Sequence, residues 1–168
     1  MPERLPEDFS GLEIPLTVIA SDLYRRREVA FSTGPLRRAL AASISLPTIM
    51  RPVEVDGQIL VDGGATNPLP FEHLRGQADV IVAVEISGPV EDHQREVPNA
   101  LECLYATVLV MTHSIVSEKL RHGAPDLLVQ PKVGSFRALG FLQASAILRA
   151  ADHVKAELKE KLAKLLEA

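Results

Sequence analysis

Cysteine is almost absent from this chain, in which Cys103 is the only one among 168 residues. A single cysteine excludes a disulfide within the chain and a zinc site built from several of its cysteines. This usage suits a reducing, intracellular setting, so we expect a cytoplasmic protein. Cys103 lies between Leu101 and Leu104 of an expected helix, and we expect it to be a small buried side chain rather than a reactive thiol.

Long uncharged apolar runs and a secretory signal are also lacking. No segment approaches about 18 uncharged apolar residues, so no membrane-spanning helix is expected. The first residues, MPERLPEDFSGLEIPL, carry acids and prolines where a signal peptide needs a basic start and an apolar run. The net charge is -4 with basic and acidic residues interspersed, which excludes the basic surface that binding to nucleic acid requires.

Two kinds of ligand site have no sequence signature. No glycine fingerprint of a nucleotide-binding turn follows an expected strand. No dense set of oxygen ligands occurs at the spacing of a calcium loop. We therefore expect neither a cofactor nor a metal.

The chain is 46% hydrophobic, enough for one globular domain with a sizeable core. Apolar runs and an Asp-Gly turn predict strands, and apolar residues at helical spacing predict helices between them. The expected strands cover residues 15–20, 28–31, 53–55, 58–61, 79–86 and 126–130. The expected helices cover residues 36–44, 68–74, 101–120 and 147–165. This alternation predicts an α/β fold with a mostly parallel sheet flanked by helices.

The segment VDGGATNPLP, residues 61–70, is the most informative stretch. An apolar strand ends there in Asp62, followed by Gly63 and Gly64, which permit positive φ and a close approach of another backbone or a substrate. Asp62 fits either a simple turn or a carboxylate that orients or deprotonates a nucleophile's hydroxyl, and chemistry alone favours the turn. Asp22 also follows an expected strand, and a capping or turn role is favoured for it. In a parallel sheet both would reach the crevice at the strands' carboxyl ends.

The remaining polar residues that could form a functional site are expected at the surface. None of the histidines pairs with another at helical ligand spacing, and a surface or helix-face role is expected for residues 73, 93, 113, 122 and 153. His73 alone follows Asp62 closely enough to approach a site there. The cluster Arg25 to Arg27 fits a solvated surface better than a site for anionic head groups. The C-terminal helix balances its acids with lysines, which favours packing on its own sheet over lying on a membrane.

Four segments in succession, IPLTVIASDL, VAFSTGPLRRALAASISLP, PVEVDGQILVDGGATNPLP and ADVIVAVEISG, resemble the C-terminal portion of the patatin-like phospholipases, particularly the bacterial and neuropathy-target-esterase-like members. In that family a nucleophile-elbow serine and an aspartate of an Asp-Gly-Gly/Ala motif form a catalytic pair. The resemblance implies that Asp62 is the catalytic aspartate, that Gly63 and Gly64 shape the pocket floor, and that Asn67 belongs to the pocket motif. The implied reaction is hydrolysis of a lipid ester through a Ser/Asp dyad.

The family's glycine-rich oxyanion loop and Gly-x-Ser-x-Gly elbow do not occur in this sequence. We therefore expect residues 1–168 to be the C-terminal portion of a patatin-like hydrolase domain, incomplete at the N-terminus and inactive alone. The alternative is a non-catalytic interaction or scaffold domain derived from such an enzyme. Expected partners are a lipid ester substrate, a membrane surface in peripheral contact, and either a second copy of the chain or the missing N-terminal portion.

Overall fold

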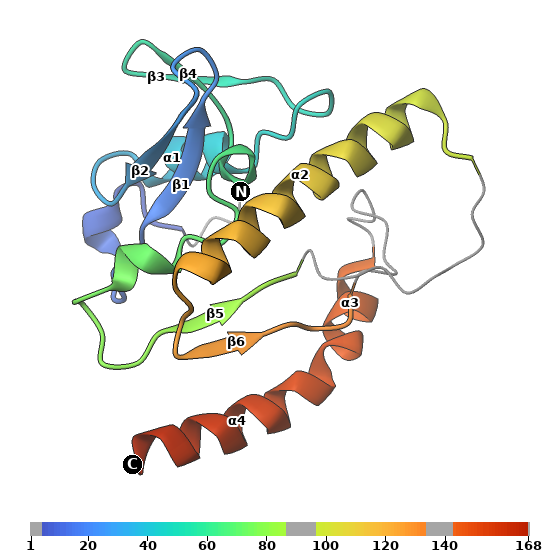
Figure 1. Cartoon of the computed structure of the whole chain (residues 1–168). Coiled ribbons are helices and arrows are strands. Elements are labelled where there is room, and N and C mark those ends of the chain that lie inside the picture. Colours follow the sequence, from blue (N-terminus) through green and yellow to red (C-terminus); the bar gives the residue numbers. More distant parts are fainter. Residues whose placement is uncertain (1–4, 87–96, 134–142, 168) are drawn as a thin grey trace. The chain divides into compact units, whose positions relative to one another are not determined.

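The structure, a computed structural model, describes residues 5–86, 97–133 and 143–167. The chain forms two compact units, Met1–His73 and Leu74–Ala168, and each is described by itself (Figure 1). Both units combine helices with strands, so the expected α/β class is confirmed.

A four-stranded sheet organises the first unit, with strand order β2-β1-β4-β3. Its strands are β1 (Val18–Asp22), β2 (Arg27–Phe31), β3 (Val53–Val55) and β4 (Gln58–Asp62). Its helices are α1 (Leu36–Ser43) and the short 3₁₀ helices η1 (Phe9–Gly11), η2 (Gly63–Ala65) and η3 (Phe71–Leu74). The expected hairpin of β3 and β4 is confirmed, since Asp56 and Gly57 both take the positive φ values of a tight hairpin turn.

The mostly parallel sheet predicted from the sequence is not found in this unit. All three strand pairs, β1 with β2, β1 with β4, and β3 with β4, are antiparallel. The reason is that short turns, which can join only antiparallel neighbours, connect β1 to β2 and β3 to β4. β1 and β4 therefore run in opposite directions, and their register places Asp62 opposite Ala20 and Asp22 opposite Leu60.

The core of the first unit lies between the sheet and α1. Leu36 on α1 and Leu60 on β4 are completely buried. One apolar cluster joins Phe9, Val18, Leu36 and Ala39, and a second joins Ala20, Ala42, Val55 and Leu60. All five residues of β1 are buried, because β1 is an inner strand of the sheet and contacts both α1 and η2. This central strand fixes the position of its neighbour β4.

The second unit contains one short parallel pair, β5 (Val82–Val84) with β6 (Leu127–Val129). The C-terminal helix α4 (Asp152–Leu166) follows α3 (Ala144–Ala150) and contacts β6, so its expected packing on a sheet is confirmed. Val154 is the buried residue of α4. The sequence also predicts a charged, proline-bounded loop at residues 88–98 and a loop around the glycines at 134 and 140. The first lies largely, and the second wholly, outside the described residues.

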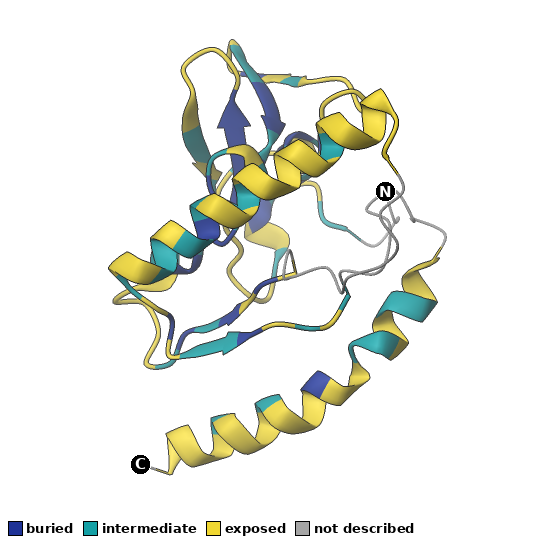
Figure 2. Ribbon diagram, turned by 45° about the vertical axis from the view of Figure 1, so that its right-hand side comes forward, coloured by how far each residue is buried: buried dark blue, intermediate teal, exposed yellow. Residues whose placement is uncertain are grey.

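Helix α2 (Ala100–His122) begins with a capping box between Asn99 and Glu102, and it ends at Gly123 as expected. Apolar spacing predicts an inner face of this helix made of Leu101, Leu104, Val108, Met111, Ile115 and Leu120. That prediction is wrong: the first four are exposed, Ile115 and Leu120 are half-buried, and Val116 is the one buried residue of the helix (Figure 2). Cys103 is exposed too, so its predicted burial is also wrong. Apolar spacing identifies residues that share a face but not whether a partner covers that face.

Length and composition would allow α2 to cross a membrane, although no such segment was expected from the sequence. The sequence expectation rested on uncharged residues throughout, and length and composition alone do not establish a membrane span. Glu118 and Lys119 lie near the end of the helix, where a charged pair leaves a long apolar stretch before it. Core helices of soluble proteins meet the same criterion.

Candidate active site

Asp62 occupies the last position of β4, and its backbone is held from two sides. Its N–H donates to the carbonyl of Ser45 at 3.1 Å. Its carbonyl accepts a hydrogen bond from the hydroxyl of Ser21 at 2.8 Å. Since Ser21 lies on β1 and Ser45 follows α1, the position of Asp62 depends on the packed core of the unit.

The side chain of Asp62 caps the 3₁₀ helix η2. Its Oδ1 accepts a hydrogen bond from the N–H of Gly64 at 2.8 Å. Within the described parts of the chain, Oδ2 has no hydrogen bond or ion pair. The carboxylate therefore combines the turn role favoured by its chemistry with one oxygen that can accept an additional hydrogen bond.

Gly63 is buried directly against β1. A Cβ at this position would lie 2.3 Å from the carbonyl oxygen of Ile19 and 2.8 Å from its carbonyl carbon. The expected close approach of a backbone is therefore confirmed. The positive φ that the two glycines permit is used by neither Gly63 nor Gly64.

The turn after Asp62 is closed by hydrogen bonds to the carbonyl of Gly63. The N–H groups of Thr66 and Asn67 donate to it at 3.1 Å and 2.9 Å. The hydroxyl of Thr66 also lies 2.8 Å from that of Ser21. These contacts tie residues 62–67 to β1 as one rigid turn.

Burial raises the pKa of the Asp62 carboxyl above its ordinary value, and the hydrogen bond from Gly64 opposes part of that rise. A half-buried carboxylate with a raised pKa is a stronger base than a solvated one. The arrangement can therefore accept a proton from a hydroxyl brought to Oδ2.

Asp22 has the turn role that was expected. Its Oδ1 accepts hydrogen bonds from the N–H groups of Tyr24 at 3.1 Å and Arg25 at 2.8 Å, and its Oδ2 pairs with the Arg25 guanidinium at 3.0 Å. These contacts, led by the N–H of Arg25, lower the pKa of Asp22. The cluster Arg25 to Arg27 is exposed, as predicted for a solvated surface.

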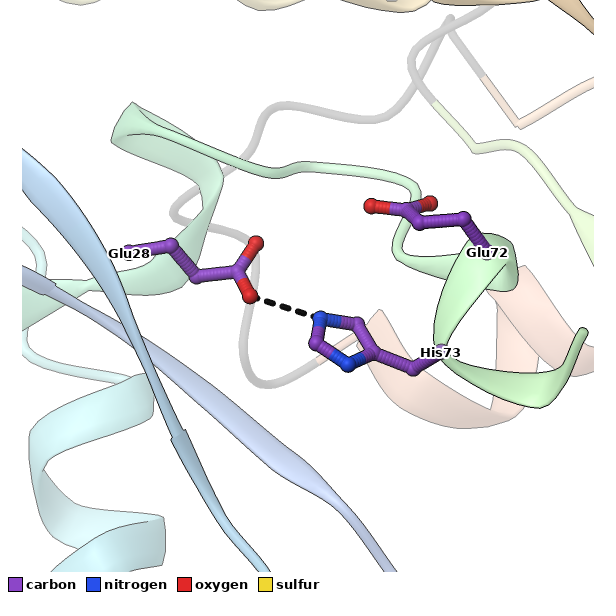
Figure 3. Close-up of side chains that lie close together, drawn as sticks. All are labelled: Glu28, Glu72 and His73. Carbon is purple, nitrogen blue, oxygen red and sulfur yellow. Dashed lines mark hydrogen bonds and ion pairs between the residues drawn. The ribbon is translucent and has the colours of Figure 1, made fainter.

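Asn67, assigned to the pocket motif by resemblance, is buried and lies between two carboxylates. Its Nδ2 donates to Oε2 of Glu28 and, at 2.6 Å, to Oε1 of Glu72. His73 Nε2 lies 2.6 Å from Oε1 of Glu28 (Figure 3). The sequence reasoning missed Glu28 and Glu72, because no local pattern brings β2 and η3 together.

The other histidines of the described residues lie on helix surfaces, as expected. Those at 113, 122 and 153 are exposed, and each ring lies within hydrogen-bonding distance of a group on its own helix or at the end of the preceding helix. The histidine at 93 lies outside the described residues. Of the four histidines that the structure describes, only His73 belongs to a polar cluster with side chains from another element.

Comparison with known proteins gives the same family for the unit that holds Asp62. The family model described as patatin-like phospholipase matches residues 3–75. Residues 3–75 are thus similar in sequence to the patatin-like phospholipases. The match covers β1, α1, the hairpin and η3, and it ends just after His73.

Curated relatives match a stretch of this chain of similar length. Uncharacterized NTE family proteins of Mycobacterium bovis and Mycobacterium tuberculosis are 43% identical over 84 residues, which cover 49% of this chain and 23% of each relative. Lysophospholipase nte1 of Aspergillus niger is 35% identical over 78 residues, 46% of this chain and 5% of the relative. The aligned part is thus less than a quarter of the mycobacterial relatives' length.

Replacing Gly63 by alanine tests the close contact beneath Asp62. The added Cβ would strike the Ile19 backbone, which cannot move without disturbing β1, so Gly63→Ala should lower the free energy of unfolding by about 1–3 kcal/mol. Gly64→Ala is the matched control, because its Cβ would meet only the Asp62 Oδ1 atom, at 3.0 Å. Urea denaturation measures both, and equal stability of Gly63→Ala and the wild type would contradict the contact.

Removing the charge of Asp22 and of Asp62 should change the stability of the fold in opposite directions. The lowered pKa of Asp22 means that its carboxylate stabilises the fold at neutral pH and that this stability is lost as pH falls through the folded pKa. The raised pKa of Asp62 means that its contribution is present at low pH and lost as pH rises through the folded pKa.

Urea denaturation at about pH 7 should therefore show Asp22→Asn less stable than the wild type, and Asp62→Asn equally or more stable. At about pH 3 the loss caused by Asp22→Asn should shrink. A marked loss of stability for Asp62→Asn at neutral pH, with none for Asp22→Asn, would reverse the assignment.

Proposed function

We propose that this chain supplies the general-base aspartate of a lipid acyl hydrolase, and that Asp62 is that residue. Lipid hydrolysis is supported at the level of the family by the match over residues 3–75. The observation that carries the proposal is the half-buried Asp62 carboxylate, held in a glycine-lined turn with a raised pKa and one oxygen open to a hydroxyl.

In the proposed mechanism a serine hydroxyl from outside this sequence approaches Oδ2 of Asp62. The carboxylate takes the hydroxyl proton while the serine oxygen attacks the carbonyl carbon of a lipid ester. The proton then passes to the departing alcohol, which leaves an acyl-serine and the ionised carboxylate. Water, deprotonated in the same way by Asp62, releases the fatty acid and restores the serine.

Two features of the turn support this role for Asp62. A carboxylate is a weak base at neutral pH, so a two-residue system needs fixed geometry and limited access of water. The hydrogen bonds from Ser21 and to Ser45 fix the backbone, and Gly64 fixes one carboxylate oxygen. Partial burial supplies the raised pKa. In this proposal Gly63 and Gly64 form the floor of the site without placing side chains in it.

The substrate we propose is a phospholipid or lysophospholipid. The Aspergillus niger relative is named a lysophospholipase. The family match over residues 3–75 includes the Asp62 turn. We propose that the reaction takes place in the cytoplasm, with peripheral contact to a membrane that holds the lipid. No metal or cofactor takes part in the proposed acyl transfer. Asn67 would support the pocket by holding the turn to η3 through Glu72.

The direct test uses a protein that contains this chain together with the serine segment. Asp62→Asn should lower lysophospholipid hydrolysis at least about a hundredfold, because the amide cannot accept the serine proton. Asp56→Asn is the matched control, since Asp56 lies in the exposed hairpin turn and asparagine tolerates its positive φ. The chain alone should remain unlabelled by a fluorophosphonate.

Retained hydrolysis in Asp62→Asn would remove Asp62 from the mechanism. Complete inactivity of the wild-type protein with the serine segment present, on both phospholipid and lysophospholipid, would favour the alternative of a non-catalytic interaction domain. Circular dichroism of each variant separates loss of the base from loss of the fold.

We also propose that the 168-residue chain self-associates through the apolar surface of α2 when the rest of a parent domain is absent. Val110 and Met111 are 65% and 60% exposed, an unusual density of apolar surface for a soluble helix. Sedimentation should show species heavier than 18.3 kDa, and the double variant Val110→Gln/Met111→Gln should shift them toward the monomer. Leu166→Gln on α4, 67% exposed, is the control. A monodisperse wild-type monomer would contradict this association.

A further inference from the structure

We propose that Glu28, Glu72 and His73 form a binding site for a divalent transition-metal cation such as Zn²⁺. The site lies in the same unit as Asp62 but uses different side chains. It plays no part in the proposed acyl transfer, so it can fail while that proposal stands.

The three side chains converge from two elements. Glu28 projects from β2, and Glu72 and His73 are consecutive residues of η3. One ligand atom from each lies within 4.8 Å of the others. Figure 3 shows the Glu72 and His73 side chains extending from η3 toward the Glu28 carboxylate of β2. The three groups thus surround one small volume.

The donor set suits a borderline cation. Imidazole nitrogen and carboxylate oxygen are the ligands of many zinc sites, whereas calcium and magnesium favour oxygen alone. Zinc holds such atoms at about 2.0–2.2 Å, so two ligands of a tetrahedral site lie roughly 3.3 Å apart. His73 Nε2 and Glu28 Oε1 are 2.6 Å apart, so side-chain movement of less than about 1 Å would bring this pair to the separation of two zinc ligands.

The negative charge of the two carboxylates favours binding of a divalent cation over hydrogen bonding to neutral donors. Glu28, Glu72 and His73 are each half-buried, so the two carboxylates repel each other more strongly than they would in water. The Asn67 amide now bridges them with its Nδ2 group. A cation of charge +2 would balance both carboxylates directly, and a half-turn of the amide would present Oδ1 as a fourth ligand.

Binding would fasten β2 to η3. The backbone N–H of Asn67 already donates to Gly63, so an ion held beside its side chain would also brace the turn that carries Asp62. Such a site would raise the thermal stability of the first unit in proportion to its occupancy. The competing account is a hydrogen-bonded cluster of the same residues that binds no ion.

Calorimetric titration of the chelator-treated 168-residue chain with Zn²⁺ separates these accounts. We expect about one ion per chain at this site, with Glu72→Gln and His73→Gln each weakening the affinity about tenfold or more. The matched control is the double variant Glu118→Gln/His122→Gln, which removes an exposed glutamate–histidine pair of α2 separated by 3.5 Å. The control should bind with the affinity of the wild type.

A second measurement on the wild type guards against variants that fail to fold. Substoichiometric Mn²⁺ should selectively broaden the backbone amide signals of Glu28, Asn67, Glu72 and His73. The proposal is overturned if the wild type binds no Zn²⁺, if the control weakens binding as much as the site variants do, or if the broadening lies elsewhere.

Discussion

The close contact between Gly63 and the backbone of Ile19 is the constraint on which the Asp62 site depends. It lets the chain turn directly beside β1, where a side chain would strike a carbonyl oxygen at 2.3 Å. Antiparallel pairing of β4 with β1 places Asp62 opposite Ala20. Hydrogen bonds with Ser21 and Ser45 hold the Asp62 backbone on either side. Because β1 is buried along its whole length, this scaffold cannot shift without opening the core.

Identical side chains acquire different chemistry from these surroundings. Asp22 is saturated by backbone N–H groups and Arg25, which favour its ionised form and fit it for holding a turn. Asp62 is partly buried, which disfavours its ionised form, and its single backbone donor, Gly64, offsets only part of that effect, so the carboxylate is fitted for accepting a proton. The difference lies in the number of donors each carboxylate meets, not in its position at the end of a strand.

Local features of the fold were predictable from the sequence, whereas contacts between distant segments were not. The hairpin at Asp56 and Gly57 and the limits of α2 follow from turn and capping chemistry within a few residues. The antiparallel order of the sheet, the exposure of α2 and the meeting of Glu28 with His73 depend on packing that periodicity does not encode. The family resemblance identified Asp62, but only the structure shows how Gly63 and Gly64 differ.

The central claim is that the fold holds the Asp62 carboxylate in a half-buried turn that makes it more basic. A pH titration of its carboxyl ¹³C chemical shift in the 168-residue chain, assigned by comparison with Asp62→Asn, measures this directly. The account predicts a midpoint above that of an ordinary aspartate and above that of Asp22 in the same sample. A midpoint for Asp62 at or below that of Asp22 would contradict it.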